Sequence, residues 1–531
     1  MTGPGPRVHS GLPAAAGLLL AIASPAAAQE ATWILRRGAD TVAIETVRRT
    51  PGRLEATLLD PGQRIRWRFA AILGPGEAVT AFENAFALAS DSVGAEPRQR
   101  AELAFEGDSV IAIINPGPGA RVQRLGTRAG ALPFLNPSFA LVEQAVRRAR
   151  ALGGDSVVVP LFAVSGGQTF DALVLRRGRD SVDVRIGGAV AHLRLDAAGM
   201  LVSGSVPAQG LVLERTAAAG PMRLAAPGYG APPGAPWTAV EVRIASAPGV
   251  ELAGTLTLPA GASPRRRVPA VVTISGSGAQ DRDEAIPLVK GYAPFREVAD
   301  TLARRGIAVL RYDDRGFGQS TGSFAASTSL DFAADVRAAV AWLRQRPEVD
   351  PRRIALLGHS EGGLVAPLVA VDDPDLAAVV LMAAPARTGR EILEYQTRVL
   401  VEKDSTIPPA ARDSAVAAAR GQRDSLARSA AWMAFFLAHD PLPVARRLRL
   451  PVLVLQGATD RQVTADQAGE LAGAIRAGGN RRVASHVFVE TNHLFLADRD
   501  GSPAGYARLR DTRVRRNVLG LLADWLVATL R

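Results

Sequence analysis

The sequence predicts an α/β domain with a mostly parallel, doubly wound sheet, preceded by a smaller mainly-β domain. Three observations support this prediction. From residue 237 onward, short apolar runs alternate with helical segments. Residues 29–216 instead contain short strand-like segments separated by turn residues, and residues 217–236 between the two regions are rich in Ala, Pro and Gly. A chain of 531 residues is long enough for two or three domains.

The region 29–216 is expected to be mainly β. Segments rich in Val, Ile and Leu alternate with charged residues, as in half-buried strands. An Asp-Ser/Thr-Val triplet recurs at Asp40, Asp91, Asp108, Asp155 and Asp180. Asp and the nearby glycines tolerate the backbone angles of hairpin turns. The irregular spacing argues against a propeller or solenoid. One helix is expected from Pro137 to Leu152, so we predict a small curved sheet, barrel or sandwich.

Residues 217–236 have the composition of a linker, and we place the domain boundary there. Beyond it, two strands are expected at 240–244 and 252–258. Six more strands are expected, and their ranges are 270–275, 307–312, 354–358, 378–382, 452–456 and 485–489. These are almost continuous runs of Val, Ile, Leu and Ala, typical of strands that are covered on both faces.

Helical segments at 295–304 and 331–344 lie between these strands, and such alternation predicts parallel pairing with right-handed crossovers. Residues 386–448 interrupt the alternation with mostly helical patterns. We expect this insertion to form a helical cap over the carboxyl edge of the sheet, within a second domain that spans 237–531.

The N-terminus resembles a signal peptide. Arg7 precedes an apolar run over 11–23, and Ala26-Ala27-Ala28 offers a small-residue cleavage site before Gln29. We therefore expect residues 1–28 to be removed and the mature chain to be periplasmic or secreted. The sequence has no Cys, so disulfides cannot stabilise it.

The composition also argues against several classes of function. The net charge of +11 comes from scattered Arg residues, with Lys only at Lys290 and Lys403. The basic residues form no stripe interleaved with aromatic residues, so nucleic-acid binding is not expected. No internal apolar run approaches the ~18 residues that a membrane span needs. Neither a phosphate-binding loop with its Lys nor a cluster of His and carboxylates with metal-ligand spacing is present, so we expect no cofactor and no metal.

The main chemical motif is Gly358-His359-Ser360-Glu361-Gly362. A G-x-S-x-G motif between a strand and a helix places its serine on a tight turn, where the hydroxyl can act as a nucleophile. Ser360 directly follows an apolar strand and precedes an apolar helical segment. Gly318-Gln319-Ser320-Thr321-Gly322 also matches, but it lies several residues beyond its strand and is followed by a polar stretch. We therefore predict Ser360 as the nucleophile and Ser320 as a loop residue.

The remaining members of a catalytic triad are expected later in the chain, the acid before the histidine. Asp460 follows the strand at 452–456 and can orient a histidine, while Asp466 is a fallback that lies in the next helix. Only His486 and His493 follow Asp460. His486 lies within a predicted strand, whereas His493 follows that strand in a loop. We predict Asp460 and His493 as acid and base, and His486 as structural.

An oxyanion hole requires backbone N–H donors directed at the developing charge. We expect one donor to be the amide of Glu361, next to the nucleophile. The second should come from the loop after the strand at 270–275, where Ser277 is preferred and Gly276 or Gly278 is possible. In the cap, the apolar segment 432–437 fits the wall of an acyl pocket and equally fits a buried helix.

Residues 238–531 resemble the α/β-hydrolase superfamily. More narrowly, they are similar to bacterial carboxylesterases near the dienelactone-hydrolase and prolyl-oligopeptidase branch. The resemblance rests on five features, which are the segment 275–283, the motif Asp313-Asp314-Arg315-Gly316-Phe317-Gly318, the serine motif with Gly363, Asp460 and His493. The chain departs from many relatives in having Ser275 where a His precedes the oxyanion glycine. Residues 29–236 are not covered.

This resemblance implies a serine hydrolase that cleaves small-molecule carboxylic esters through an acyl-enzyme on Ser360. A peptidase or amidase of prolyl-oligopeptidase type is an alternative, because a triad does not by itself select esters over amides. The N-terminal region is too short and irregular for the propeller of those enzymes. A binding protein with a vestigial hydrolase domain is a further alternative, which the complete and correctly ordered triad disfavours.

Overall fold

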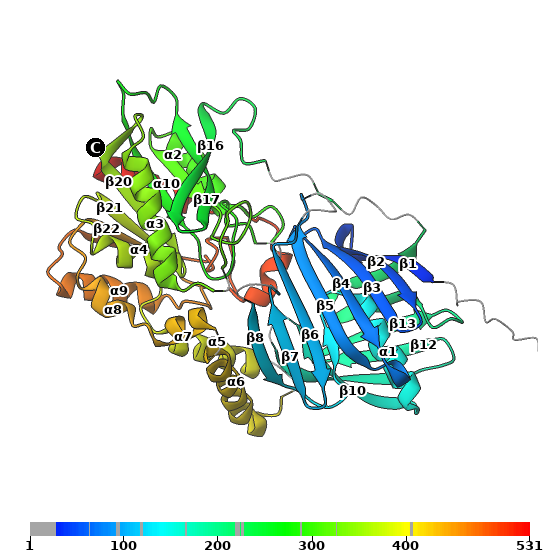
Figure 1. Ribbon diagram of the computed structural model, residues 1–531. Helices are drawn as coiled ribbons and strands as arrows, with labels where there is room; N and C mark the ends of the chain where they lie inside the picture. The colour runs from blue at the N-terminus through cyan, green and yellow to red at the C-terminus, as the bar shows by residue number, and fades with distance from the viewer. Residues whose placement is uncertain are drawn as a thin grey trace, which may run out of the picture. The chain divides into compact units, whose positions relative to one another are not determined.

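The computed structural model describes residues 28–531 except 63, 92–95, 117–119, 165–166, 218–222, 225–227, 287–288, 325, 404–406 and 429. The chain divides into two compact units, Met1–Leu224 and Ala225–Arg531 (Figure 1). The division lies inside the segment 217–236. Except for Ala28, the expected signal peptide at 1–28 lies outside the described residues. In the described part of the chain, no helix has the length and apolar character needed to cross a bilayer.

The first unit is built on one sheet of 15 strands. Its elements are β1 (Gln29–Arg37), β2 (Asp40–Thr50), β3 (Arg53–Asp60), β4 (Ile65–Leu73), β5 (Val79–Leu88), β6 (Gln99–Glu106), β7 (Ser109–Ile114), β8 (Arg121–Gly126), β9 (Leu132–Phe134), α1 (Phe139–Leu152), β10 (Ser156–Ala163), β11 (Thr169–Arg176), β12 (Ser181–Ile186), β13 (Ala189–Leu195), β14 (Leu201–Val206) and β15 (Leu211–Thr216). Short 3-10 turns lie at Pro75–Glu77 and Pro207–Gln209.

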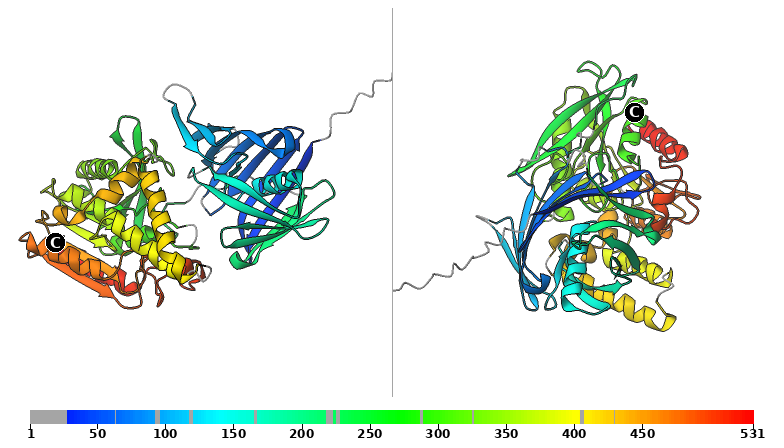
Figure 2. Two further views of the ribbon diagram at one scale, coloured as in Figure 1. Left: turned by 90° about the horizontal axis from the view of Figure 1, so that it is seen from below. Right: turned by 90° about the vertical axis from the view of Figure 1, so that its right-hand side faces the viewer.

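Strands β1 to β8 pair in sequence as antiparallel neighbours, and so do β10 to β15. Strand β9 pairs with β10 in parallel, β1 pairs with the distant β15, and β8 and β9 are the two edges of the sheet. Strands β2, β7, β10 and β12 begin at the Asp-Ser/Thr-Val triplets or one residue into them. The sheet curves around α1, whose apolar face lies in the core (Figure 2). The predicted helix and β-rich character are confirmed. The sheet is larger than the small one expected, because the β1–β15 pairing joins two runs of hairpins into one sheet.

The second unit has an eight-stranded sheet in the order β16-β17-β19-β18-β20-β21-β22-β23. The strands are β16 (Trp237–Ala247), β17 (Val250–Pro259), β18 (Val268–Ile274), β19 (Ala308–Tyr312), β20 (Val349–His359), β21 (Ala378–Met382), β22 (Val452–Gly457) and β23 (Val483–Phe488). Strand β17 pairs antiparallel with β16 and β19, and the other pairs are parallel. The mostly parallel sheet and all eight strands are therefore confirmed.

Helices cover both faces of this sheet (Figure 1). They are α2 (Pro294–Ala303), α3 (Ser329–Arg344), α4 (Gly362–Ala370), α5 (Gly389–Lys403), α6 (Arg412–Ala427), α7 (Ala431–Ala438), α8 (Pro441–Ala445), α9 (Asp466–Ala477) and α10 (Arg516–Thr529), with 3-10 turns at Pro409–Ala411 and Pro503–Arg508. Helices α3, α4 and α9 share one apolar core with the sheet, and α2 and α10 share another. Helices α5, α6 and α7 lie between β21 and β22 and pack on one another.

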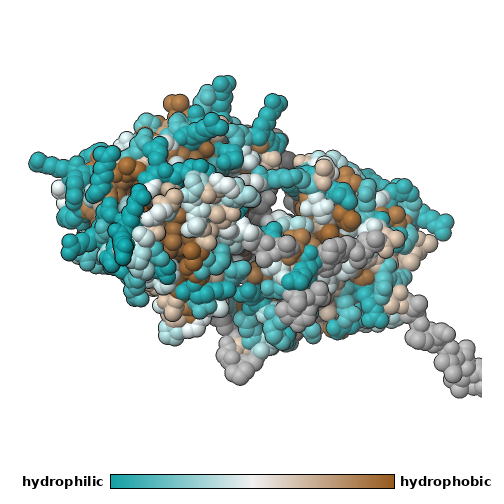
Figure 3. Space-filling model, turned by 90° about the horizontal axis from the view of Figure 1, so that it is seen from above, coloured by the Kyte–Doolittle hydropathy of each residue, from teal (hydrophilic) through white to brown (hydrophobic). Residues whose placement is uncertain are grey.

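The surface shows no single large apolar patch in the view of Figure 3, where hydrophobic side chains form several separate groups among hydrophilic ones. The most exposed large apolar side chains are Val489, Val122 and Leu400, which come from distant parts of the sequence. Isolated apolar side chains of this kind are ordinary on a soluble surface and do not mark a docking site.

Candidate active site

Ser360 lies on a tight turn between β20 and α4, with a backbone φ of +52°. A non-glycine residue in this left-handed region carries strain that the surrounding structure must hold in place. The flanking glycines permit the turn. A Cβ on Gly358 would lie 2.0 Å from the carbonyl oxygen of Gly362, and one on Gly362 would lie 2.1 Å from that of Ile274. Only glycine fits at either position.

The hydroxyl of Ser360 faces an imidazole. The Nε2 atom of His493 lies 3.1 Å from Ser360 Oγ, and its Nδ1 lies 2.7 Å from Asp460 Oδ2. Asp460 follows β22 and His493 follows β23, so the three side chains come from the carboxyl ends of three parallel strands. The arrangement allows the imidazole to accept the serine proton while the carboxylate holds its tautomer and stabilises the imidazolium.

Asp460 is fixed by further contacts. Its Oδ1 accepts hydrogen bonds from the backbone N–H groups of Gln462 and Val463, and its Oδ2 accepts one from the side chain of Gln456 at 2.8 Å. The carboxylate is fully buried. These donors leave it little freedom to rotate.

Asp466, the fallback acid, and His486, which was predicted to be structural, lie elsewhere. Asp466 begins α9 and forms ion pairs with Arg387. His486 lies within β23, is exposed, and its ring packs against Phe488 at 4.4 Å. The structure therefore brings together the three residues preferred from the sequence and leaves these two apart.

The loop after β18 passes directly beside the nucleophile. A Cβ on Gly276 would lie 3.1 Å from that of Ser360, so glycine allows this close approach. The Gly276 amide already donates to Glu284 Oε1 at 2.7 Å, which removes it as an oxyanion donor. Within the described residues, the amides of Ser277, Gly278 and Glu361 have no acceptor. Their N–H groups can therefore bind an incoming oxygen.

Ser275 and Asp314 fix the start of this loop. The Ser275 hydroxyl donates to Asp314 Oδ1 at 2.7 Å, and the amide of Gln280 donates to Asp314 Oδ2 at 2.9 Å. Burial raises the pKa of Asp314 well above its usual range, although both hydrogen bonds act in the opposite direction. Ser275, the departure noted from sequence, thus ties the oxyanion loop to the end of β19.

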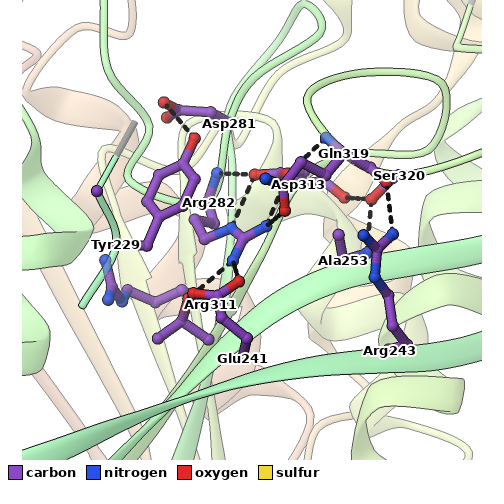
Figure 4. Close-up of polar contacts among 12 residues, drawn as sticks. Tyr229, Glu241, Arg243, Ala253, Asp281, Arg282, Arg311, Asp313, Gln319 and Ser320 are labelled. Atoms are coloured by element: carbon purple, nitrogen blue, oxygen red, sulfur yellow. Dashed lines mark hydrogen bonds and ion pairs between the residues drawn. The ribbon is translucent and has the colours of Figure 1, made fainter. Parts of the chain in front are cut away.

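A buried guanidinium anchors the other end of the loop (Figure 4). Arg282 is fully buried, donates twice to the Asp313 carboxylate, and donates to Glu241 Oε2 at 2.6 Å. The Tyr229 ring lies 4.1 Å from the Arg282 guanidinium carbon, in a cation–π contact. Sequence reasoning used Arg282 and Asp313 only as marks of resemblance. It also assigned Tyr229 to a linker, although this side chain is buried in the second unit.

A cavity of about 310 Å³ opens beside the triad. Ser360, His493 and Ser277 line one side, and Trp432 and Phe436 of α7 line another. The Trp432 and Phe436 rings stack at 5.2 Å, and the Trp432 indole donates to Glu361 Oε1 at 2.8 Å. The apolar cap segment therefore lines the cavity, and its Phe436 is also buried. This size suits a small acyl group.

A larger open hollow, of about 1140 Å³, lies on the first unit over β1–β6. It is lined by mixed Glu, Arg, Thr and Ala residues and contains neither Ser nor His. The smaller cavity is the stronger candidate site, because the Ser360 hydroxyl, the His493 imidazole and free backbone amides converge there. Among the described residues, no group of three or more His, Asp or Glu side chains is placed to hold a metal ion.

Comparison with known proteins finds one family model and several relatives that are similar to this chain. Residues 288–500 match a family model described as "Serine aminopeptidase, S33". Esterase EstD of Thermotoga maritima is 31% identical over 294 residues, which are 52% of this chain and 65% of EstD. Thiohydrolase apmlB of Arthrinium phaeospermum is 37% identical over 91 residues, 16% of this chain and 28% of that protein. The chain thus spans less than two thirds of the length of these relatives.

Among solved structures, the esterase Pf2001 of Pyrococcus furiosus aligns with a TM-score of 0.41 at 18% identity, covering 57% of this chain and 96% of that one. The strand order of the second unit, the serine turn between β20 and α4 and the sequence matches agree with one another. The C-terminal unit of this chain is similar to proteins of the α/β-hydrolase superfamily.

Proposed function

We propose that this protein hydrolyses carboxylic esters of small molecules through an acyl-enzyme on Ser360. The supporting observation is the continuous contact from Asp460 through His493 to the Ser360 hydroxyl, at the floor of a cavity with free backbone amides. The relation to a protein named as an esterase favours esters as the substrate class.

The reaction takes two steps. His493 Nε2 removes the proton from Ser360 Oγ, which attacks the ester carbonyl carbon. The amides of Ser277 and Glu361 stabilise the resulting oxyanion, and His493 then delivers its proton to the departing alcohol. In the second step, water loses a proton to His493 and attacks the acyl group. The acid is released and the proton returns to Ser360, so the enzyme is regenerated.

Amide cleavage is the second candidate, because the matching family model is described as a serine aminopeptidase. A graded series of nitrophenyl esters, assayed beside aminoacyl nitroanilides, separates the two activities. We expect kcat/KM for a short-chain ester to exceed that for every nitroanilide by at least about 10²-fold, and Ser360→Ala to abolish both. Faster turnover of a nitroanilide would replace the ester assignment by the amide one.

We also propose that the mature protein is exported to the periplasm or secreted. The support is the apolar segment and small-residue site before Gln29. Mass spectrometry of the natively produced protein tests this, with a mature N-terminus at Gln29 as the expected result. A chain that retains residues 1–28 would contradict it.

A further inference from the structure

His359, the residue before Ser360, engages both of its ring nitrogens. Its Nδ1 lies 2.8 Å from Glu284 Oε1, and its Nε2 lies 3.0 Å from the backbone carbonyl oxygen of His493. The side chain is 5% exposed. The triad described above does not use this imidazole, yet it contacts the backbone of the proposed base.

Glu284 extends this contact to the oxyanion loop. The same Oε1 atom accepts the Gly276 amide at 2.7 Å, and the side chain is 1% exposed. Glu284 itself belongs to the loop after β18, where it holds Gly276 and contacts His359, and His359 contacts the loop after β23. This pair of side chains therefore joins the two loops that supply the proposed oxyanion donor and the proposed base.

Counting protons defines the state of this pair. A backbone carbonyl can only accept, so His359 Nε2 must carry hydrogen. The 2.8 Å contact between Nδ1 and Glu284 Oε1 then requires one further proton between these two atoms, and we place it on Nδ1. The pair thus holds one proton more than a neutral imidazole and an ionised carboxylate would hold. Burial alone would lower the pKa of His359, but the nearby Glu284 charge and its hydrogen bond outweigh burial and raise it.

We propose that Glu284 and His359 form a positioning pair in which a protonated imidazole holds the His493 loop and its carboxylate partner holds the Gly276 loop. The inference rests on the proposed function, because it concerns how the base and the oxyanion donors are held at the correct distance and orientation from Ser360. A misplacement of about 1 Å in such a site can cost about 10²-fold in rate.

The pair makes a prediction about alkaline pH. The groups that face it are Asp460 and His493 beside His359, and Tyr292 and Asp314 near Glu284. Because the pKa of His359 is raised in the folded protein, its protonated form is stabilised below that pKa and is lost as the pH rises through it. A neutral His359 can donate only to Glu284 or to the His493 carbonyl oxygen, so one of these two hydrogen bonds is lost. We therefore expect kcat to fall as the pH rises through the pKa of His359.

Glu284→Gln tests the charge with little change of shape. The amide oxygen of the new residue can still accept from Gly276, but a neutral partner no longer stabilises the imidazolium. We expect kcat for a nitrophenyl ester to fall by about 10²-fold with KM within about threefold, and the alkaline limb to move down by about one pH unit or more. The matched control is Asp183→Asn, which alters a carboxylate–imidazole pair of the first unit, with His192 Nδ1 2.7 Å from Asp183 Oδ1. This control should change neither kcat nor the position of the alkaline limb.

His359→Gln and His359→Leu separate positioning from space filling. The glutamine amide can still donate to the His493 carbonyl, whereas leucine cannot. We expect His359→Gln to retain at least about tenfold more kcat than His359→Leu, because it keeps that hydrogen bond. Equal kcat in the two variants would show that His359 only fills space.

The decisive readout uses the unaltered chain. With histidine labelled by ¹⁵N, and His359→Gln to assign the signal among six histidines, both ring nitrogens of His359 should be protonated at neutral pH. A single protonated nitrogen, or wild-type kinetics in Glu284→Gln, overturns the proposal. These outcomes leave the ester assignment intact as long as hydrolysis still requires Ser360. Hydrolysis that survives Ser360→Ala would instead overturn the proposed function, whatever the state of His359.

Discussion

Two segments of the second unit share the pattern G-x-S-x-G and have opposite environments. The hydroxyl of Ser360 lies at a cavity and faces His493 Nε2 at 3.1 Å. The hydroxyl of Ser320 is fully buried, donates to the Asp313 carbonyl at 2.7 Å, and accepts the Ala253 amide at 2.9 Å (Figure 4). The motif thus supplies a serine on a turn in both places, and only the strand–turn–helix context presents it to a base.

The largest effect should separate the two serines in catalysis. Ser360→Ala removes the nucleophile, so we expect kcat for a nitrophenyl ester to fall on the order of 10⁵–10⁶-fold. Ser320→Ala should retain kcat within about tenfold, because its hydroxyl contacts the backbone of Ala253 and Asp313 and does not line the cavity beside Ser360. Steady-state assays of both folded variants check this. Comparable losses of kcat in the two would break the comparison.

Orienting the base should matter almost as much. Asp460→Asn keeps the shape of the side chain but can present an N–H group to His493 Nδ1, which favours the wrong tautomer. We expect kcat to fall on the order of 10⁴-fold with an unchanged melting temperature. A loss below about 10²-fold would mean that His493 is oriented by something else.

The two serine substitutions should have the opposite ranking in their effect on stability. Ser320→Ala leaves the Ala253 amide and the Asp313 carbonyl without this partner in a fully buried place. We expect the free energy of unfolding to fall by about 1–3 kcal/mol, measured by urea denaturation. Ser360→Ala should lower the free energy of unfolding by less than Ser320→Ala does. The opposite ranking would contradict the structural role of Ser320.

The smallest effect concerns the wall of the cavity beside Ser360. Trp432→Phe keeps an aromatic ring but loses the indole N–H that donates to Glu361. We expect KM for nitrophenyl esters to rise by about three- to tenfold with little change in kcat, because the cavity is loosened while the triad is intact. An unchanged KM across the ester series would place the acyl group elsewhere.

Much of the second unit could be predicted from the sequence, because its buried parallel strands appear as apolar runs and its triad follows chain order. His493 was distinguishable from His486 by its position after the strand rather than within it. The Glu284–His359 pair could not be predicted in this way. Glu284 lies in a loop, its own backbone φ is +55°, and His359 is 75 residues away in the sequence. No local pattern encodes that contact.

The first unit shows the complementary limit. Turn residues such as Asp108 and Asp180 predict hairpins, because hairpin chemistry is local, whereas Asp155 joins α1 to β10 instead. The pairing of β1 with β15, which makes one sheet from all the hairpins, depends on residues at opposite ends of the unit, such as Trp33 and Arg215. Tyr229 was misread for a related reason, since its Gly- and Pro-rich neighbours conceal its contact with Arg282.

The central claim is that Ser360 is the nucleophile. Reaction of the intact protein with a fluorophosphonate, followed by peptide mass spectrometry, tests it most directly. We predict one modified peptide that contains Ser360, complete loss of esterase activity when labelling is stoichiometric, and no modification of Ser320. Labelling of Ser320, or full inhibition with Ser360 unmodified, would contradict this account.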